Sequence, residues 1–215
     1  MTGGAYMKLG ACWTGTKILA SFLLGKRYYS KQHFDVFFAR SIDPWRYRSS
    51  AVASRRREII LQTLPRRSYA SMLEVGCAEG WVTTHLAQRA ERLLAIDISS
   101  VAIERARVEC RDFAYIEFKE EDVAEGIPRG PFDAIVCAGV LVYVPTVDQE
   151  ALRDRIVDEL AESGDLLLEH QSRDYPGEVP GIVIHEIFAR HAELQLLSFQ
   201  VQDDYCVSLF RKGFG

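Results

Sequence analysis

The sequence contains no hydrophobic run long enough to cross a bilayer. The apolar stretch near its start, residues 18–24, is short, whereas a membrane-spanning helix needs about 20 apolar residues. Leu9-Gly-Ala-Cys12 is similar to a lipoprotein cleavage box, but no apolar region precedes it. We therefore expect neither a secretion signal nor a membrane anchor, and we interpret residues 1–30 as a poorly ordered N-terminal extension.

Cysteine is scarce and follows no pattern. The chain has 5 cysteines, an odd number, without C-x-x-C or Cys/His spacing. This distribution argues against a disulfide framework and against a zinc site. We expect no bound metal and a reducing, cytoplasmic location.

Neither sign of charge is in large excess. The formal net charge is −4 and the pI is near 5.8, so the chain has no general attraction for nucleic acid or anionic membranes. The densest basic segment, Arg55-Arg56-Arg57, is typical of a solvated helix face. We expect no nucleic-acid partner.

Residues 31–70 differ in pattern from the rest of the chain. Residues 33–39 predict a short amphipathic helix that ends before Pro44, and residues 54–64 predict a second helix that Pro65 ends. We expect these residues to form a helical cap or lid over a core that comprises residues 71–215.

From residue 71 the chain alternates apolar runs with helical periodicity, which predicts a Rossmann-like, doubly wound α/β sheet. Only a short turn separates the last two apolar runs, so they are expected to form an antiparallel hairpin. The expected strands of this seven-stranded, mostly parallel sheet are residues 71–76, 92–97, 113–118, 132–138, 165–170, 194–201 and 205–211. The expected helices are residues 80–90, one capped by Ser99 or Ser100, residues 148–161 and residues 182–191.

The segment Met72-Leu-Glu-Val-Gly-Cys-Ala-Glu-Gly80 joins the first strand to the first helix. An apolar run containing Glu74 is followed by small residues at alternate positions, which let the backbone approach a ligand closely. The second strand ends in another carboxylate, Asp97. Two acids at strand ends beside a glycine-rich turn predict a nucleotide-like ligand with a ribose.

Two protein classes that could bind such a ligand are weighed first. An NAD-dependent oxidoreductase shares the strand, turn and acid, but it would carry G-x-G-x-x-G, and here Trp81 stands three positions after Ala78. The antiparallel hairpin also argues against that class. The second alternative is a non-catalytic binding module that retains the fold.

Four segments together resemble class I S-adenosylmethionine-dependent methyltransferases. Glu74-Val-Gly-Cys-Ala-Glu-Gly80 resembles their first motif, acid-x-Gly-x-Gly-x-Gly, with Ala78 in place of the middle glycine. Asp97 falls where their ribose-binding acid falls, Glu121-Asp122-Val123 resembles their adenine-site motif, and residues 132–138 resemble their fourth motif. The resemblance covers residues 71–211 and implies S-adenosylmethionine as the cofactor.

The resemblance implies a role for each segment. Asp97 is expected to accept hydrogen bonds from both ribose hydroxyls. Asp122, with Glu121 as the competing residue, is expected to accept from the adenine amino group, and Ile98 and Val123 to form an apolar slot for the ring. Ala138 is expected beside the methyl group. The amino-acid end of the cofactor is assigned to Glu74, Gly76, Cys77, Ala78 and Gly80.

A narrower resemblance concerns the cap. Asp43-Pro-Trp45, followed by a basic helix and Leu73-Glu-Val-Gly-Cys77, is similar to the nodulation protein S group, whose characterised members N-methylate a glucosamine unit of a chitin oligosaccharide. The similarity extends to Leu141-Val-Tyr143 and to Asp174-Tyr-Pro176. Gly139 departs from the pattern of that group, in which a glutamate is expected at this position. Its absence weakens the inference that this chain acts on the same amino-sugar substrate.

The acceptor site is expected at the carboxyl ends of the fourth and fifth strands. An amine acceptor must lose its proton before it accepts a methyl group, so a nearby group has to favour that loss. His170 is predicted as this base because imidazole titrates near neutrality. Glu169 and His185 are the alternatives, and Tyr143 is expected to orient the acceptor.

The cap is expected to complete the site. Trp45 and Arg56 are predicted to form a cofactor-binding lid that excludes water and contacts the cofactor carboxylate. The sequence thus predicts a small-molecule methyltransferase that N-methylates an amino sugar or a related amine, with O-methylation of a small molecule or natural product as the alternative. We expect a monomer or a weak homodimer.

Overall fold

A computed structural model describes residues 29–172, 175, 178–202 and 204–213. The extension expected over residues 1–30 therefore lies outside the described residues, apart from Tyr29 and Ser30. Within the described part of the chain, no helix has both the length and the apolar character needed to cross a membrane.

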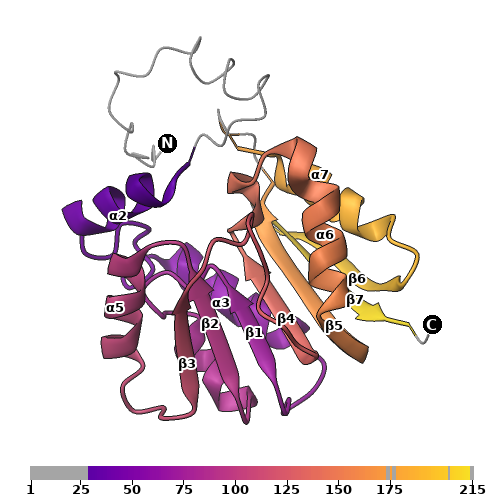
Figure 1. Ribbon diagram of the computed structural model, residues 1–215, viewed down its shortest axis with the longest axis horizontal. Coiled ribbons are helices and arrows are strands. Elements are labelled where there is room, and N and C mark those ends of the chain that lie inside the picture. The colour runs from indigo at the N-terminus through magenta and orange to yellow at the C-terminus, as the bar shows by residue number, and fades with distance from the viewer. Residues whose placement is uncertain (1–28, 173–174, 176–177, 203, 214–215) are drawn as a thin grey trace.

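The core is a seven-stranded sheet in the order β3-β2-β1-β4-β5-β7-β6 (Figure 1). The strands from β3 to β5 are mutually parallel, whereas β7 pairs antiparallel with both β5 and β6. The predicted class I methyltransferase fold, with its C-terminal antiparallel hairpin, is confirmed. The strands are β1 (Met72–Val75), β2 (Leu93–Asp97), β3 (Ile116–Glu120), β4 (Phe132–Ala138), β5 (Leu160–Gln171), β6 (Leu194–Gln202) and β7 (Tyr205–Lys212).

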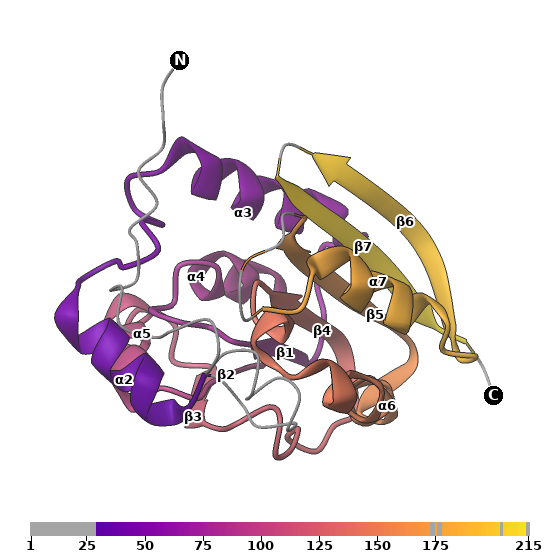
Figure 2. The same cartoon turned by 90° about the horizontal axis from the view of Figure 1, so that it is seen from above.

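Helices cover both faces of the sheet (Figure 2). Ile60 and Leu86 pack with Met72 and Val136 on one face, and Ile156 and Phe188 pack with Ile135 on the other. The first face carries α3 (Ala51–Thr63), α4 (Thr83–Leu86) with the 3₁₀ turn η1 (Ala87–Arg89), and α5 (Ser100–Glu109). The second carries η2 (Leu141–Tyr143), η3 (Thr146–Asp148), α6 (Gln149–Asp158) and α7 (Gly181–Ala189).

Predicted boundaries differ from the observed ones by one or more residues at most elements, and most clearly at three of them. The helix expected at residues 80–90 is the short α4 followed by η1, because Gly80 belongs to the preceding turn, where its N–H donates to the Cys77 carbonyl. Strand β3 begins at Ile116 rather than at Phe113, since Phe113 and Ile116 both close turns. Strand β5 begins at Leu160, within the segment that was expected to be helical.

The two helices expected before the core are present as α2 (Lys31–Arg40) and α3. Ser30 caps α2 through its hydroxyl, which accepts the N–H of His33, and Ser50 caps α3 in the same way. Helix α2 lies against α5 at the carboxyl end of β2 (Figure 1). We call residues 29–64 the cap.

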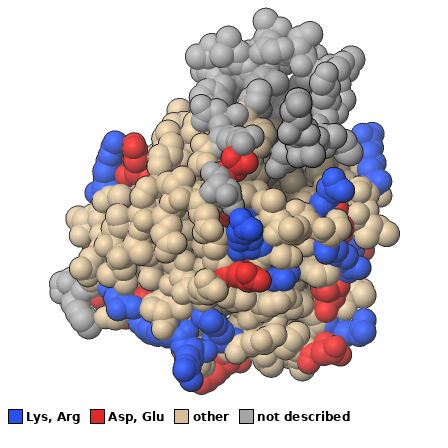
Figure 3. Space-filling model, turned by 180° about the vertical axis from the view of Figure 1, so that it is seen from behind, with Lys and Arg blue, Asp and Glu red and all other residues tan. Residues whose placement is uncertain are grey.

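Charged side chains of both signs are interspersed on the face shown in Figure 3, without a broad area of either sign. This face therefore carries no extended basic surface of the kind that binds nucleic acid.

Candidate cofactor and acceptor site

A pocket opens between α3 and the carboxyl ends of β1 and β4. On the helix side its lining residues recur at intervals of three and four, so they share one face of α3. The opposite wall is the first strand-end turn. The pocket is lined by Tyr47, Ala53, Arg56, Arg57, Ile60, Glu74, Gly76, Cys77, Ala78, Trp81, Val82 and Ala138.

Glu74 places a buried carboxyl group in the lining of the pocket. Its side chain is 2% exposed, and its Oε2 has no hydrogen-bond partner among the described residues. Burial raises the pKa of Glu74 to about 7; the Thr83 hydroxyl opposes this shift and the Asp97 carboxylate adds to it. A buried carboxylate oxygen without a partner suits a cationic ligand group.

The turn after β1 depends on three residues in left-handed conformations. Gly76 has φ +77° and Gly80 has φ +88°, and Ala78 has φ +48° where a glycine would be less strained. A Cβ on Gly76 would lie 2.6 Å from Val140 Cβ, and one on Gly80 would lie 3.0 Å from Cys110 Sγ. Both glycines are therefore required by their neighbours, and Cys77 is buried beside them.

Asp97 lies where the second strand meets this turn. Its Oδ2 accepts the Ala78 N–H at 2.9 Å, and its Oδ1 accepts the Ser99 N–H at 2.9 Å. Burial raises the pKa of Asp97 to about 6, and these N–H groups oppose the shift. Each oxygen keeps a lone pair for another donor, as binding to a pair of ribose hydroxyls requires.

The residues predicted around adenine lie farther along the carboxyl edge of the sheet. Ile98 packs into the cluster formed by α2, whereas Val123 is buried in the main core. The Glu121 N–H donates to the Asp97 carbonyl, and Asp122 Oδ1 accepts the Ala124 N–H at 2.9 Å. The adenine-site segment is thus adjacent to Asp97.

Arg56 and Glu169 form a buried ion pair beside the pocket. Arg56 Nε and Nη2 lie 2.9 and 2.6 Å from the two Glu169 carboxylate oxygens. Burial by itself would lower the pKa of Arg56, but the Glu169 carboxylate reverses this and raises it. Arg56 also lies 4.1 Å over the Tyr205 ring. Arg56 thus lines the pocket while two of its nitrogens are bound by Glu169, and its contact with the cofactor carboxylate stays a prediction.

This ion pair also accounts for Gly139. A Cβ there would lie 3.3 Å from Arg56 Nη2, and the residue has φ +66°. The Gly139 N–H donates to the Glu169 carbonyl at 2.7 Å. The carboxylate expected after strand β4 is therefore absent, and Glu169 of β5 supplies one at the same end of the sheet.

Within the basic segment of α3, Arg57 is available to bind a ligand group in the pocket. It lines the pocket with Glu74, and it has no ion pair or hydrogen bond among the described residues. Sequence reasoning missed it, although the spacing of Ala53, Arg56, Arg57 and Ile60 places all four on one helix face. Tyr47, Trp81 and Val82 were missed as pocket residues as well.

Trp45 and Tyr143 lie in an aromatic cluster that joins the cap to the core. The Tyr143 ring centroid is 5.0 Å from that of Tyr29, 5.2 Å from that of Phe34 and 6.4 Å from that of Trp45. Burial raises the pKa of the Tyr143 phenol, and the Glu178 carboxylate adds to the shift. Tyr143 is thus placed next to Glu178, as an acceptor-orienting role would require.

His170 lies on the opposite face of the sheet from the pocket. Adjacent residues of a strand face opposite sides, so Glu169 is directed to α3 and His170 to α7. His170 Nδ1 lies 3.1 Å from His185 Nε2, and His185 Nδ1 lies 2.6 Å from Ser208 Oγ. Burial lowers the pKa of both histidines. This geometry does not favour the predicted base role of His170.

Glu178 is a second uncompensated carboxylate, on the acceptor side. Its side chain is partly buried and forms no ion pair or hydrogen bond among the described residues. The next residue, Val179, donates its N–H to the Val142 carbonyl at 2.9 Å, which fixes Glu178 beside η2. Burial raises the pKa of Glu178 to about 7.

The residues present fit S-adenosylmethionine. Glu74 and Arg57 offer opposite charges to an ammonium and a carboxylate at one end of the pocket, and Asp97 offers two acceptor oxygens to a ribose. Ala138 also lines the pocket, where its small side chain leaves room for a methyl group.

Comparison with known sequences assigns the chain to a family. The model of the family described as nodulation protein S (NodS) matches residues 36–175. Nodulation protein S of Sinorhizobium fredii is 31% identical over 184 residues, which cover 80% of this chain and 84% of that protein. Nodulation protein S of Bradyrhizobium diazoefficiens is 37% identical over 121 residues, which cover 55% of this chain and 58% of that protein.

Solved structures agree with this assignment. The N-methyltransferase NodS from Bradyrhizobium japonicum WM9, in complex with S-adenosyl-L-homocysteine, superposes with a TM-score of 0.76 and 27% identity, covering 85% of this chain and 97% of that one. The magnesium protoporphyrin IX methyltransferase of Synechocystis, at 15% identity and a TM-score of 0.67, shares the fold. The family match, the related sequences and the shared fold lead to one conclusion: this chain belongs to the nodulation protein S family.

Proposed function

We propose that the protein is an S-adenosylmethionine-dependent N-methyltransferase whose acceptor is the amine of a small molecule, with an amino sugar as the favoured class. The observation that carries the cofactor assignment is that Glu74 and Arg57 line one pocket together with Ala78, whose N–H binds Asp97. The family assignment sets aside the NAD-dependent alternative.

The pocket residues divide the cofactor between them. Glu74 would bind the ammonium of the cofactor, Arg57 its α-carboxylate, and Asp97 its ribose hydroxyls. The small residues Gly76 and Ala78 would let the backbone of the turn approach the cofactor closely. When bound, S-adenosylmethionine supplies the methyl group and a sulfonium leaving group. The protein's contribution is to fix the direction of approach and to exclude water.

Cofactor affinity is expected to rise with pH because Glu74 must be ionised to bind an ammonium. In the free protein the pKa of Glu74 is about 7, so binding releases a proton below that pH. The Kd for S-adenosylhomocysteine should fall by roughly one order of magnitude from pH 5.5 to 7.5, as calorimetric titration would show. Glu74→Gln should flatten most of this dependence; an equally steep curve in the variant would contradict the assignment.

Arg57→Met is expected to weaken S-adenosylmethionine binding about 10- to 100-fold, since a charge-assisted hydrogen bond contributes about 1.5–3 kcal/mol. The decarboxylated cofactor lacks the carboxylate, so its affinity should be the same in both proteins. The exposed neighbour Arg55, replaced by Met, is the matched control. Equal losses for both ligands would show that Arg57 acts only on the fold.

Glu178 is the residue that we assign to the acceptor's proton. A nitrogen must be neutral to form a new N–C bond, because the bond uses its lone pair. Glu178 is uncompensated, lies beside Tyr143, and has its pKa raised to about 7 by burial. Its carboxylate accepts the ammonium proton, and Tyr143 orients the nitrogen. Glu169 cannot do this, because Arg56 binds both of its oxygens.

Glu178→Gln is expected to lower kcat/KM for the acceptor about 100-fold, the lower range for loss of a general base. At saturating cofactor the wild-type rate should rise as pH passes through about 7, and the variant should lose this rise. Cofactor affinity should not change. Glu186→Gln on the exposed side of α7 is the control, and unchanged acceptor kinetics in Glu178→Gln would remove the residue from the mechanism.

The proposed reaction is tested with two acceptors that differ in one group. Chitin oligosaccharides with one free amine and their fully N-acetylated counterparts are incubated with methyl-labelled S-adenosylmethionine. Label is expected only in the free amine. Label in both would favour O-methylation, and binding of the cofactor without transfer to any amine or hydroxyl acceptor would favour the non-catalytic module.

We also place the enzyme in the cytoplasm, as a monomer or a weak homodimer that acts without a nucleic-acid partner. The unpatterned cysteines and the balanced charge support this assignment. We assign residues 31–70 to an N-terminal helical lid, which contains most of the cap, and residues 71–215 to the catalytic core.

A further inference from the structure

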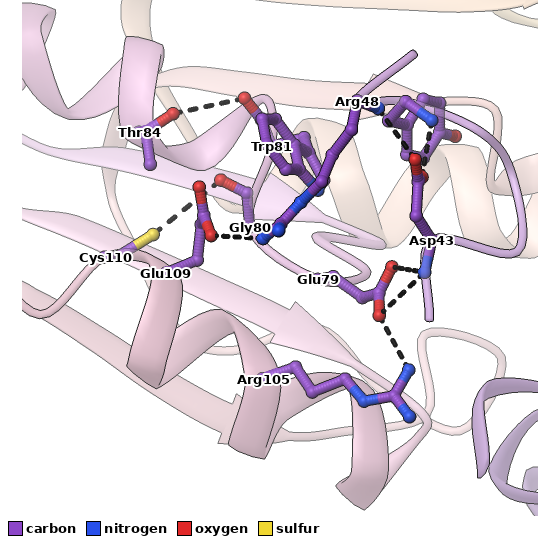
Figure 4. A network of polar contacts seen from close by, with 10 residues as sticks. Asp43, Arg48, Glu79, Gly80, Trp81, Thr84, Arg105, Glu109 and Cys110 are labelled. Atoms are coloured by element: carbon purple, nitrogen blue, oxygen red, sulfur yellow. Dashed lines mark hydrogen bonds and ion pairs between the residues drawn. The ribbon is translucent and has the colours of Figure 1, made fainter. Parts of the chain in front are cut away.

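Glu79 is the one charged residue of the first strand-end turn that the cofactor roles do not use. It is 6% exposed, although it belongs to a turn at the edge of the sheet. Its carboxylate accepts hydrogen bonds from the Asp43 N–H at 3.1 Å and from Arg105 Nη1 at 2.7 Å (Figure 4). Glu79 therefore connects the cap to the cofactor turn and to α5.

The same arginine binds the cap directly. Arg105 Nη1 donates to the Ser41 carbonyl at 2.8 Å as well as to Glu79. Removing the Glu79 carboxylate would leave the Asp43 N–H and part of the Arg105 guanidinium without an acceptor. The cap, the turn after β1 and helix α5, which are distant in the sequence, thus meet at the Glu79 carboxylate.

The cap loop anchored in this way is strained. Asp43 and Arg46 have φ +56° and +57°, in the left-handed region, which a non-glycine residue keeps only where its surroundings fix it. The Asp43 carboxylate accepts the N–H groups of Tyr47 and Arg48. Through Asp43, Glu79 thus sets the position of Tyr47, which lines the pocket.

The segment held by Glu79 covers the ribose side of the site. Phe34 and Phe38 of α2 pack in one cluster with Ala78 and Ile98. Asp35 of the same helix accepts the Ser99 hydroxyl at 2.7 Å, two residues from Asp97. Residues 29–48 therefore lie beside Asp97, where the ribose of the cofactor would bind.

We propose that the Glu79 carboxylate is a latch that holds residues 29–48 closed over the adenosine end of the site, and that its release limits the rate of cofactor exchange. The inference rests on the proposed function, because it assumes that this site binds S-adenosylmethionine. Arg48, which pairs with Glu109 at 2.7 Å and lies 4.5 Å over Trp81, closes the far end of the same loop.

The test is stopped-flow binding of S-adenosylhomocysteine, followed by intrinsic tryptophan fluorescence, for which Trp45 and Trp81 are the reporters near the site. In the wild-type protein the observed rate should level off at high ligand, because opening becomes limiting. In Glu79→Gln, which keeps the size of the side chain, the plateau rate and the dissociation rate should both rise at least 10-fold. Glu186→Gln, which breaks an exposed pair, should leave both rates unchanged.

Two further measurements separate a latch from a simple structural contact. Arg105→Gln should raise both rates without altering the turn itself, and it gives the same information if Glu79→Gln does not fold. Raising the salt concentration should speed dissociation in the wild type and have little effect in Glu79→Gln.

The outcomes distinguish the two proposals. A higher dissociation rate with an unchanged plateau, or no change in either rate, would overturn the latch. If the wild-type protein does not bind S-adenosylhomocysteine at all, the proposed function fails instead. Rates that rise together in both variants support Glu79 as the positioning residue of the cap.

Discussion

Glu169→Gln is expected to lower the free energy of unfolding by about 3–5 kcal/mol, the cost of breaking a buried ion pair from one side. Glu169 is fully buried and the Arg56 side chain is 12% exposed. The substitution leaves a guanidinium in a site of low polarity, opposite a neutral amide. Urea denaturation followed by circular dichroism measures the change.

The companion variants show whether charge is the cause. Arg56→Met should destabilise the protein by a similar amount, whereas the double variant Arg56→Met, Glu169→Leu should recover most of the loss, because apolar pairs often replace buried ion pairs without cost. Glu186→Gln at the exposed pair with Arg190 should change stability by less than about 1 kcal/mol. Additive losses in the double variant would contradict the assignment.

Gly76→Ala is expected to lower the free energy of unfolding by about 2–5 kcal/mol and to abolish measurable cofactor binding. The left-handed conformation costs an alanine about 1–2 kcal/mol, and overpacking adds about 1–3 kcal/mol. The new methyl group would lie 2.6 Å from both Cβ and Cγ2 of Val140. Val140 cannot rotate away cheaply, because its Cβ is attached directly to the backbone.

Gly126→Ala provides the control. No atom lies within 4 Å of a Cβ at that position, and its φ is outside the left-handed region, so alanine should be neutral there or slightly stabilising. Chemical denaturation and calorimetric titration with S-adenosylhomocysteine measure both variants. Normal cofactor affinity in Gly76→Ala would show that the turn after β1 does not approach the ligand.

The pattern of the sequence determined most of the core. Buried parallel strands require unbroken apolar runs, so the positions of β1, β2 and β4 follow from the pattern of apolar residues. Strand β4 is predicted and observed at residues 132–138. The strand–turn–helix unit around Gly76 is local, because each residue's role depends on neighbours within a few positions. Its carboxylates and glycines therefore identified a nucleotide-like ligand without tertiary information.

The direction of a side chain was harder to predict from the sequence, because it changes when the register of a strand or helix shifts by one residue. Strand β5 begins at Leu160, not at residue 165, and only its pairing with β4 and β7 shows that Glu169 faces α3 while His170 faces α7. In the same way, a helix turns about 100° per residue. The docking of α3 therefore decided that Arg56 binds Glu169 and that Arg57 remains in the pocket.

The sequence by itself determined the fold of the core, the family resemblance and the acids that we assign to the cofactor, because these depend on local pattern and on the spacing of strand ends. The tertiary structure decided which arginine is available, which carboxylate stands on the acceptor side, and how Glu79 holds the cap. Each of these depends on contacts between segments tens of residues apart, such as Asp43 with Glu79 and Arg56 with Glu169. Their geometry is set by packing rather than by periodicity.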